Sequence, residues 1–345
     1  MHLIGRRASL LSILAASEFM LFGAPGVKAA PITPAMEPVI EEPVSNITSA
    51  AAGSPELVER ASKSWWVPTQ ATTWQIQLSG TINEDVVVDA IEIDADTDKA
   101  TVKALKAKGM KVIAYLSAGS WEDWRSDASS FPTSIRGKDL DGWPGEKWLD
   151  IRQLSTLRKI MQKRVLRAKA KGFDGVDWDN VDGYTQDSGF KITKAQQIAY
   201  NKMLADISHN LKMTVALKND LEQAKILARY FDYAVNEQCS YYNECDMLEP
   251  FLSAGKAVVG LEYPGEGDDT RTQAQVIAAT DSRTYTLIKK LDLGDWGFSV
   301  RQNAYITSST SSKTTSSTKT TIAKAAELKA AIQKARESAK SSSGQ

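Results

Sequence analysis

Short β-type runs alternate with helix-type runs from residue 65 to about residue 290, and this alternation restricts the chain to an α/β fold. Gly109 and Gly172 end two of the helical runs, as glycine commonly does at a helix C-terminus. The predicted strands cover residues 74–79, 86–94, 111–117, 175–178, 213–217, 233–236, 257–262 and 285–288. The predicted helices cover residues 97–108, 156–171, 195–210, 220–229, 247–254 and 273–280.

Strands separated by helices over roughly 240 residues fit one (β/α)8 TIM barrel, which we predict for residues 65–305. The competing arrangement is a doubly wound open sheet. That fold often carries a G-x-G-x-x-G loop after its first strand, and no such loop follows the first predicted strand here. The pattern therefore favours the barrel and gives no support to a dinucleotide site.

The N-terminal residues resemble a secretory signal. Arg6 and Arg7 precede a mostly apolar run, and Val27-Lys28-Ala29 offers small residues for cleavage after Ala29. We predict a signal peptide over residues 1–29 and a protein that is secreted and extracellular or cell-wall associated. An uncleaved membrane anchor is the alternative.

Two further segments lack the pattern of a packed domain. Residues 30–64 are predicted to be a linker, with an N-glycosylation acceptor at Asn46. Residues 306–345 are predicted to be a Ser/Thr-rich tail whose Ala- and Lys-rich second half fits a short helix.

The charge balance gives no reason to expect a nucleic acid or an anionic membrane as partner. The chain has 42 basic and 42 acidic residues, so its formal net charge is zero. Beyond the signal segment we expect no membrane association, and we expect a monomer. In a secreted chain the two cysteines, Cys239 and Cys245, are expected to form a disulfide, with two unpaired thiols as the alternative.

Histidine is scarce, and this argues against two common kinds of active site. Only His2 and His209 occur, so a Ser-His-Asp triad lacks a candidate base and a His-ligated zinc site lacks ligands. The spacing from Asp177 and Asp179 to Gly183 does not match an EF-hand loop. We therefore expect neither a cofactor nor a catalytic metal.

One acidic stretch stands out at residues 172–184, GFDGVDWDNVDGY. Buried acids are costly unless they are paired or functional, and polar residues at the C-terminal end of a strand are typical of α/β enzyme sites. Two flanking carboxylates are the minimum for glycoside hydrolysis. We pair Asp179 with Glu237, which ends the predicted strand at 233–236. Asp177 remains an alternative reactive acid, and a structural capping role remains open for Asp179.

Polar and aromatic residues near other strand ends form the predicted substrate-binding set, because such ends converge on one barrel mouth. Aromatic rings offer faces on which sugars stack, although many of them pack in protein cores. The predicted residues are Trp74, Asp94, Tyr115, Trp121, Trp143, Asp150, Asp177, Asn180, Lys218, Asn236, Glu262 and Tyr263.

Several long motifs resemble glycoside hydrolase family 114: QLSG (77–80), VIAYLSAGSWEDWR (112–125), GWPGEKWLDIR (142–152), GFDGVDWDNVDGY (172–184), LKND (217–220) and NEQCSYYNEC (236–245). The resemblance covers residues 65–265. It implies a (β/α)8 barrel with endo-α-1,4-polygalactosaminidase activity. It also implies that Asp179 is the nucleophile and Glu237 the general acid/base. Asp177 departs from the pattern, since members often carry Glu there.

The predicted function is therefore a secreted glycoside hydrolase that cleaves internal α-1,4-galactosaminide linkages of an amino-sugar polysaccharide, by a retaining two-carboxylate mechanism. A barrel that binds such a polymer without cleaving it is one alternative, and a glycosidase for another α-linked sugar is the other. Acids at the mouth would attract the ammonium groups of the polymer.

Overall fold

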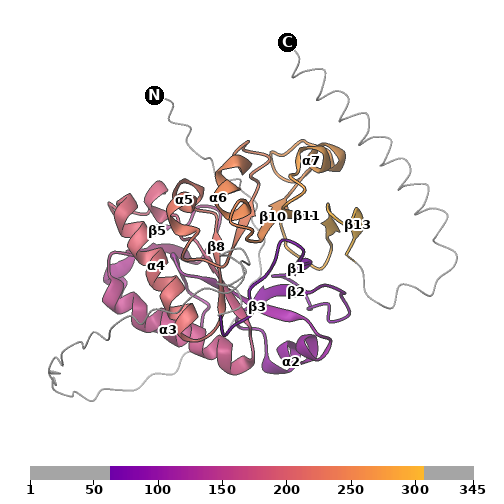
Figure 1. Cartoon of the computed structure of the whole chain (residues 1–345). Helices are drawn as coiled ribbons and strands as arrows, with labels where there is room; N and C mark the ends of the chain where they lie inside the picture. Colours follow the sequence, from indigo (N-terminus) through magenta and orange to yellow (C-terminus); the bar gives the residue numbers. More distant parts are fainter. Residues whose placement is uncertain (1–62, 307–345) are drawn as a thin grey trace, which may run out of the picture.

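The computed structural model describes residues 63–306, and eight parallel strands form the wall of a barrel at its centre (Figure 1). Each predicted strand is present, which confirms the (β/α)8 prediction. The strands pair in the order β1-β2-β3-β7-β8-β9-β10-β11. Their bounds are β1 Trp74–Ile76, β2 Ala90–Asp94, β3 Lys111–Ser117, β7 Gly175–Asp179, β8 Thr214–Lys218, β9 Tyr233–Glu237, β10 Val258–Glu262 and β11 Tyr285–Ile288.

The two ends of this sheet, β1 and β11, meet without a hydrogen-bonded ladder in the described chain, and we call this place the seam. Side chains and loops close it instead. Gln75 Nε2 donates to Asp295 O at 2.7 Å, and Lys289 Nζ donates to Gln75 Oε1 at 3.1 Å. Beyond β11 the sheet continues through the antiparallel strands β12 (Phe298–Ser299) and β13 (Ala304–Tyr305).

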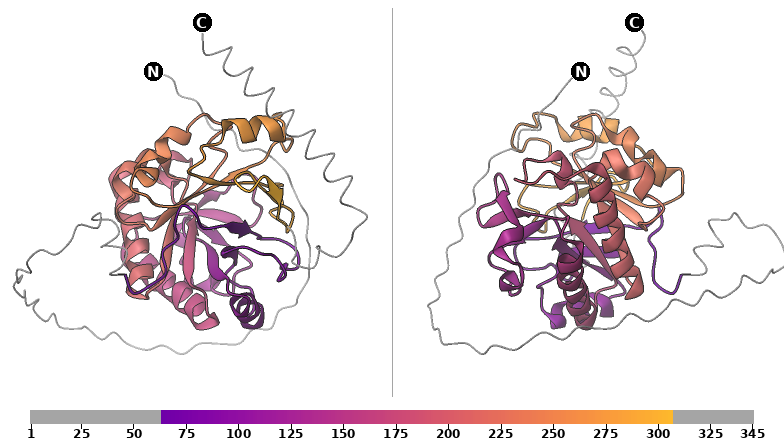
Figure 2. Two further views of the ribbon diagram at one scale, coloured as in Figure 1. Left: turned by 45° about the vertical axis from the view of Figure 1, so that its right-hand side comes forward. Right: turned by 90° about the vertical axis from the view of Figure 1, so that its left-hand side faces the viewer.

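Helices cover the outside of the barrel (Figure 2). They are α2 Lys99–Ala107, α3 Leu154–Lys171, α4 Lys194–Asn210, α5 Ala224–Leu227, α6 Glu249–Leu252 and α7 Gln273–Ala279. Helices were predicted at all six places, but α5 and α6 are single turns, each preceded by a 3-10 turn, η4 (Leu221–Gln223) and η5 (Cys245–Leu248). Two other 3-10 turns, η1 (Ala128–Ser130) and η2 (Thr133–Ile135), lie between β3 and α3, and η3 (Gly183–Thr185) follows β7.

Local signals in the sequence explain where the longer helices begin and end. Asp98 caps α2 by accepting from the backbone amides of Ala100 and Thr101. Thr193 and Gln196 form a capping box at the start of α4. Helix α3 ends at Gly172, which has a φ of 107°, a conformation that glycine adopts without strain.

A small antiparallel sheet, which the sequence patterns did not predict, is inserted between β3 and α3. It consists of β4 (Ser120–Glu122), β5 (Arg136–Asp139) and β6 (Glu146–Leu149), in the order β4-β6-β5. The insertion starts directly after β3, so it brings residues 120–149 to the end of the barrel at which the parallel strands finish.

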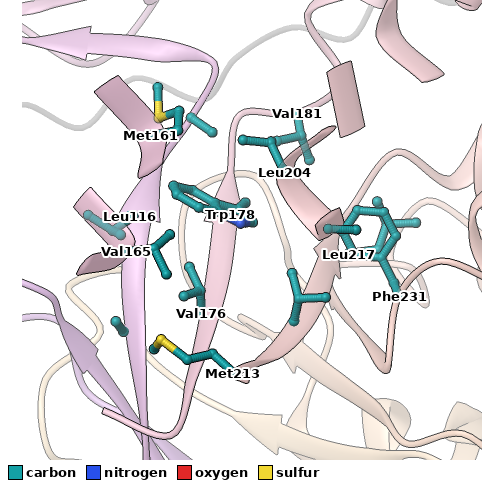
Figure 3. Close-up of a cluster of buried hydrophobic side chains, with 14 of the residues drawn as sticks. Leu116, Met161, Val165, Val176, Trp178, Val181, Leu204, Met213, Leu217 and Phe231 are labelled. Atoms are coloured by element: carbon teal, nitrogen blue, oxygen red, sulfur yellow. The ribbon is translucent and has the colours of Figure 1, made fainter. Parts of the chain in front are cut away.

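Alternation along the strands separates an outer core from an inner one. Figure 3 shows part of the outer core, where Val176 and Trp178 of β7 lie among Met161 and Val165 of α3 and Leu204 of α4. The inner core fills the barrel and includes Trp74, Tyr233, Val259 and Leu287. Because Val176 and Trp178 face outward, Asp177 and Asp179 face into the barrel.

Some predictions fall on residues outside 63–306. These are the signal peptide (1–29), nearly all of the linker (30–64), the glycosylation acceptor Asn46 and nearly all of the tail (306–345). Within 63–306, no helix has the length and apolar character needed to cross a membrane.

Candidate active site

Three neighbouring strands end in the three charged residues at the centre of the site. Asp179, Lys218 and Glu237 are the last residues of β7, β8 and β9. Lys218 Nζ lies 3.0 Å from Asp179 Oδ1 and 3.1 Å from Glu237 Oε2. These two contacts place Asp179 Oδ1 and Glu237 Oε2 within about 6 Å of each other.

Each of these strand ends is followed by a residue with a positive φ. The values are 60° at Asn180, 51° at Asn219 and 62° at Gln238. Non-glycine residues rarely adopt this conformation, and Asn does so more readily than most. The chain therefore turns sharply as soon as each charged side chain has been placed, and this keeps all three at the rim of the barrel.

The carboxylate of Asp179 has partners on both oxygens. Tyr115 Oη donates to Oδ2 at 2.7 Å. The backbone N–H of Asn180 donates to Oδ1 at 2.8 Å, and Lys218 Nζ donates to the same oxygen. Burial raises the pKa of Asp179, but the Lys218 charge and these hydrogen bonds outweigh it, so the pKa lies below its usual value. The arrangement favours an ionised Asp179.

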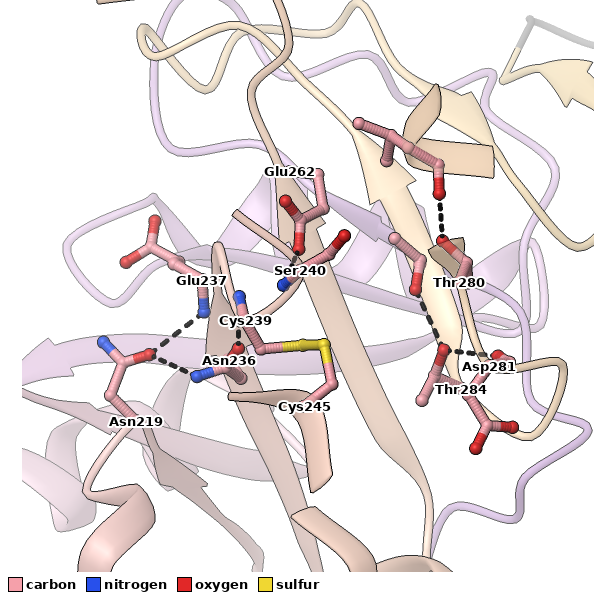
Figure 4. The surroundings of a disulfide bond; sticks show 12 residues. Asn219, Asn236, Glu237, Cys239, Ser240, Cys245, Glu262, Thr280, Asp281 and Thr284 are labelled. Atoms are coloured by element: carbon pink, nitrogen blue, oxygen red, sulfur yellow. Dashed lines mark hydrogen bonds between the residues drawn. A yellow bond between two sulfur atoms is a disulfide. The ribbon is translucent and has the colours of Figure 1, made fainter. Parts of the chain in front are cut away.

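Glu237 is held through both its backbone and its side chain. Asn219 Oδ1 accepts the Glu237 backbone N–H at 3.0 Å and an N–H of Asn236 at 3.2 Å (Figure 4). The Tyr263 hydroxyl donates to Oε1 of Glu237. Just beyond Glu237, the predicted disulfide between Cys239 and Cys245 is present, which confirms that prediction.

Two more acids lie deeper in the barrel, below Lys218. Asp177 is fully buried, and both of its oxygens lack a hydrogen-bond donor in the described chain, as does Oε2 of Glu92. Burial raises the pKa of Asp177 to about 7 and raises that of Glu92 well above its usual value. Sequence reasoning placed Glu92 at a strand end but did not include it in the site. Its i, i+2 spacing from Asp94 could have revealed that both face inward.

The inserted sheet supplies a further acid, Glu146 of β6, which the sequence analysis did not include in the site. Ser120 Oγ donates to Glu146 Oε2 at 2.5 Å and lies 2.6 Å from Ser117 Oγ, which accepts from Asn180 Nδ2 at 3.0 Å. This chain of polar groups leads from Glu146 to the loop that holds Asp179. Burial raises the pKa of Glu146 to about 7.

The strand-end acid Asp94 is engaged by an arginine. Arg125 Nη1 and Nη2 each donate to one oxygen of Asp94 at 2.7 Å, and Nη2 also lies 2.9 Å from Glu122. Asp94 keeps 31% of its side chain exposed. It therefore remains accessible at the rim although it is paired.

Other predicted binding residues lie away from this centre. Asn236 and Glu262 occupy outward positions, where Asn236 accepts the Cys239 amide and Glu262 pairs with Arg271 at 2.6 Å. Asp150 is buried and bound bidentately by Arg152. Trp74 is fully buried inside the barrel and stacks on Tyr233.

The two remaining predicted aromatics belong to the inserted segment. Trp121 is half-buried, donates to Ala128 O and carries the Arg136 guanidinium over its ring. Trp143 is 59% exposed, and the neighbouring Trp124 is 55% exposed. These two open rings are the aromatic surface that the inserted loop presents to solvent.

One group of potential metal ligands occurs among the described residues, formed by Cys239, Cys245 and Glu262. The two sulfur atoms are joined in a disulfide and provide no thiolate, and Glu262 is already paired with Arg271. These residues do not fit a metal ion. The absence of a catalytic metal stays a prediction.

Comparison with known proteins places this arrangement in a family. The model of glycoside hydrolase family GH114 matches residues 55–305. The chain belongs to family GH114. The match contains the whole barrel with its paired carboxylates, and it confirms the resemblance read from the motifs. The chain is therefore a glycoside hydrolase.

Similar proteins include two solved structures and one further sequence. Ega3 of Aspergillus fumigatus, solved in complex with galactosamine, is 40% identical, with a TM-score of 0.64 over 68% of this chain and 97% of Ega3. The hydrolase domain of PelA from Pseudomonas aeruginosa shares the fold, at 17% identity and a TM-score of 0.52 over 67% of this chain and 99% of that domain. An uncharacterized protein of Deinococcus radiodurans is 25% identical over 252 residues, which are 64% of this chain and 81% of the relative.

Proposed function

We propose that this GH114 enzyme is a secreted endo-hydrolase that cleaves internal α-1,4-galactosaminide linkages of an amino-sugar polysaccharide with retention of configuration. The observation that carries the proposal is the contact of Lys218 with both Asp179 and Glu237, which keeps two carboxylates close together at the barrel mouth. The choice of galactosamine is supported by the similarity to Ega3, whose structure contains that sugar.

In the proposed first step, an oxygen of Asp179 bonds to the anomeric carbon as the glycosidic bond breaks. Glu237 gives its proton to the departing oxygen. In the second step water attacks the same carbon, Glu237 takes a proton from this water, and Asp179 leaves as a carboxylate. The lowered pKa of Asp179 supports its role, because the nucleophile must be ionised.

A proton on Oε2 of Glu237 would break its ion pair with Lys218, whereas Lys218 would keep its contact with Asp179. The Tyr263 hydroxyl on Oε1 would then hold the protonated Glu237 in place. We assign Lys218 and Tyr115 to positioning Asp179. For substrate contacts we keep the residues with accessible side chains near the mouth or on the inserted loop, which are Asp94, Asn180, Trp121 and Trp143. Tyr263 lines the mouth beside Glu237.

The test compares the parent with Asp179→Asn and Glu237→Gln on deacetylated polygalactosamine, with chitosan and a neutral α-galactan as alternative polymers. Asp187→Asn is the matched control, because its side chain is 81% exposed and its ion-pair partner in the described part of the chain is Lys138 at the surface. We expect short oligosaccharides from polygalactosamine with the parent and the control. Both site variants should lose at least about a thousandfold in rate.

Three other outcomes separate the alternatives. A parent that binds polygalactosamine without releasing oligosaccharides would be a binding barrel. Release from another polymer only would change the substrate. A first-formed product of inverted configuration, measured by NMR of the anomeric proton, would remove the nucleophile role from Asp179.

A further inference from the structure

Two buried acids below the catalytic carboxylates have no function in the steps just described. Asp177 lies two residues before Asp179 on the inward face of β7, and Glu92 lies on the inward face of β2. Asp177 is 0% exposed and Glu92 is 2% exposed. Isolated charges at such depth are very costly, so a specific arrangement must neutralise or balance them.

The two side chains contact each other, and each affects the protonation of the other. Neither oxygen of Asp177 nor Oε2 of Glu92 receives a donor from the rest of the described chain. Ionised carboxylates only accept hydrogen bonds, so a contact between two of them is attractive only when a proton lies between them. This contact and the missing donors have one common explanation, which is a shared proton.

The charged groups around the pair define what it can influence. Lys218 of β8 acts on both acids, Asp179 acts on both, and Glu237 of β9 acts on Asp177. Tyr233 of β9 also lies near both acids, and its hydroxyl has no hydrogen-bond partner in the described chain. Lys218 is therefore placed between the pair and the two catalytic carboxylates.

We propose that Glu92 and Asp177 share one proton and carry a single negative charge at neutral pH, and that this charge balances Lys218 from below. The two acids are then positioning residues that limit how strongly Lys218 acts on Asp179 and Glu237. The catalytic part of this inference rests on the function proposed above. The shared proton does not.

The kinetic test determines how many negative charges the pair carries. It uses amide substitutions, which remove a carboxyl group but keep the shape of the side chain. Glu92→Gln and Asp177→Asn each leave one carboxyl, so each should keep the single charge, and the alkaline limb of kcat/KM should stay where it is in the parent. The double variant has no charge in the pair. Lys218 then acts fully on Glu237, which loses its proton more easily, and the alkaline limb should move about one pH unit lower.

Two results would overturn the charge assignment. If each single variant moves the limb part of the way towards the position in the double variant, the pair carries two charges. If one single variant moves the limb as far as the double variant does, the charge belongs to that acid alone and no proton is shared. If the double variant leaves the limb unmoved while it folds normally, the pair does not act on Lys218. Asp187→Asn again serves as the control for removal of a surface acid.

A readout independent of activity tests the shared proton. The folded parent would hold one proton that the unfolded chain releases above about pH 4, so its stability should fall as pH rises from 5 to 8. Each single variant lacks that proton, so its melting temperature relative to the parent should rise over the same range. Equal pH dependence in the parent and both variants would refute the pair. Lack of hydrolysis by the parent would instead refute the proposed function.

Discussion

The hydroxyl of Tyr115 donates a 2.7 Å hydrogen bond to Oδ2 of Asp179, the oxygen that Lys218 does not contact. Tyr115 comes from β3 and Lys218 from β8, on the two sides of β7. Asp179 is thus held from both neighbouring strands, and its two oxygens are distinguished by their partners.

Tyr115→Phe should remove this bond while keeping the ring. A hydrogen bond to a charged group contributes about 1.5–3 kcal/mol, so we expect a drop in kcat/KM of at least about tenfold. The pKa of Asp179 should rise, which moves the acidic limb of the pH profile upward, since the proposed mechanism needs the ionised form. Tyr305→Phe, at an exposed position, is the control. An unmoved acidic limb would show that Tyr115 does not influence this ionisation.

Lys218→Met should destabilise the fold and impair catalysis together. Methionine keeps an unbranched side chain but ends one atom before the position of the ammonium group. Two carboxylates therefore lose their shared cation, and breaking a buried pair costs about 3–5 kcal/mol. We expect lower resistance to urea and a pKa increase for Asp179, because its largest favourable charge is gone. Lys225→Met, on the exposed side of α5, should change neither property. Parent-like stability in the Lys218 variant would contradict the bridging role.

Gly119→Ala should disturb the site through the backbone. A Cβ at Gly119 would lie 1.6 Å from the carbonyl oxygen of Asn180, so the two loops must separate. Overpacking of this kind costs about 1–3 kcal/mol, and the displacement would reach the amide that binds Asp179. Gly294→Ala, where the nearest atom is 3.5 Å away, is the control. Equal melting temperatures and rates for both variants would rule out this tight approach.

The disulfide variant Cys239→Ser/Cys245→Ser should lose about 2 kcal/mol of stability, because the bond closes a short loop. Chemical denaturation with and without a reductant measures the effect. The parent should approach the variant in reductant, and the variant should not respond. Because the loop begins two residues after Glu237, kcat should fall more than KM rises. A variant as stable as the oxidised parent would show that the crosslink does not stabilise the fold.

Asp220→Asn tests a buried acid outside the catalytic centre. Burial and nearby acids, first among them Asp182, raise the pKa of Asp220 to about 9. The folded protein therefore holds a proton that the unfolded chain loses near pH 4, and this stabilisation decreases as pH rises towards 9. Relative to the parent, the variant should gain up to about 1.4 kcal/mol of stability for each pH unit between 5 and 8. A constant difference would mean that Asp220 is ionised throughout.

The sequence was sufficient for the barrel, because each parallel strand is buried and bounded by turn residues. It also paired Asp179 with Glu237, and the structure brings both side chains to Lys218. It did not separate strand-end side chains that face the barrel interior from those that face outward. Asn236 and Glu262 were therefore grouped with Glu237, although the two-residue period of a strand places them on the outer face. Applied strictly, that period would have placed Glu92 on the inward face of its strand together with Asp94.

Other features depend on long-range placement that local patterns do not encode. Glu146 reaches the loop of Asp179 only through the inserted sheet, whose strands are four residues or shorter. The role of Lys218 as a bridge depends on the order of β7, β8 and β9 around the barrel. No spacing along the chain predicts that a lysine stands between two acids 58 positions apart in sequence.

The two acids are carried by strands that have one strand between them, and neighbouring strands are about 4.8 Å apart. The ladder of the sheet, rather than the length of any loop, thus determines whether a water molecule fits between the acids. Loops at the mouth can then be exchanged to accept other polymers without changing the stereochemical course of hydrolysis. In such redesigned enzymes, the preferred polymer would change while the anomeric configuration of the product stays the same.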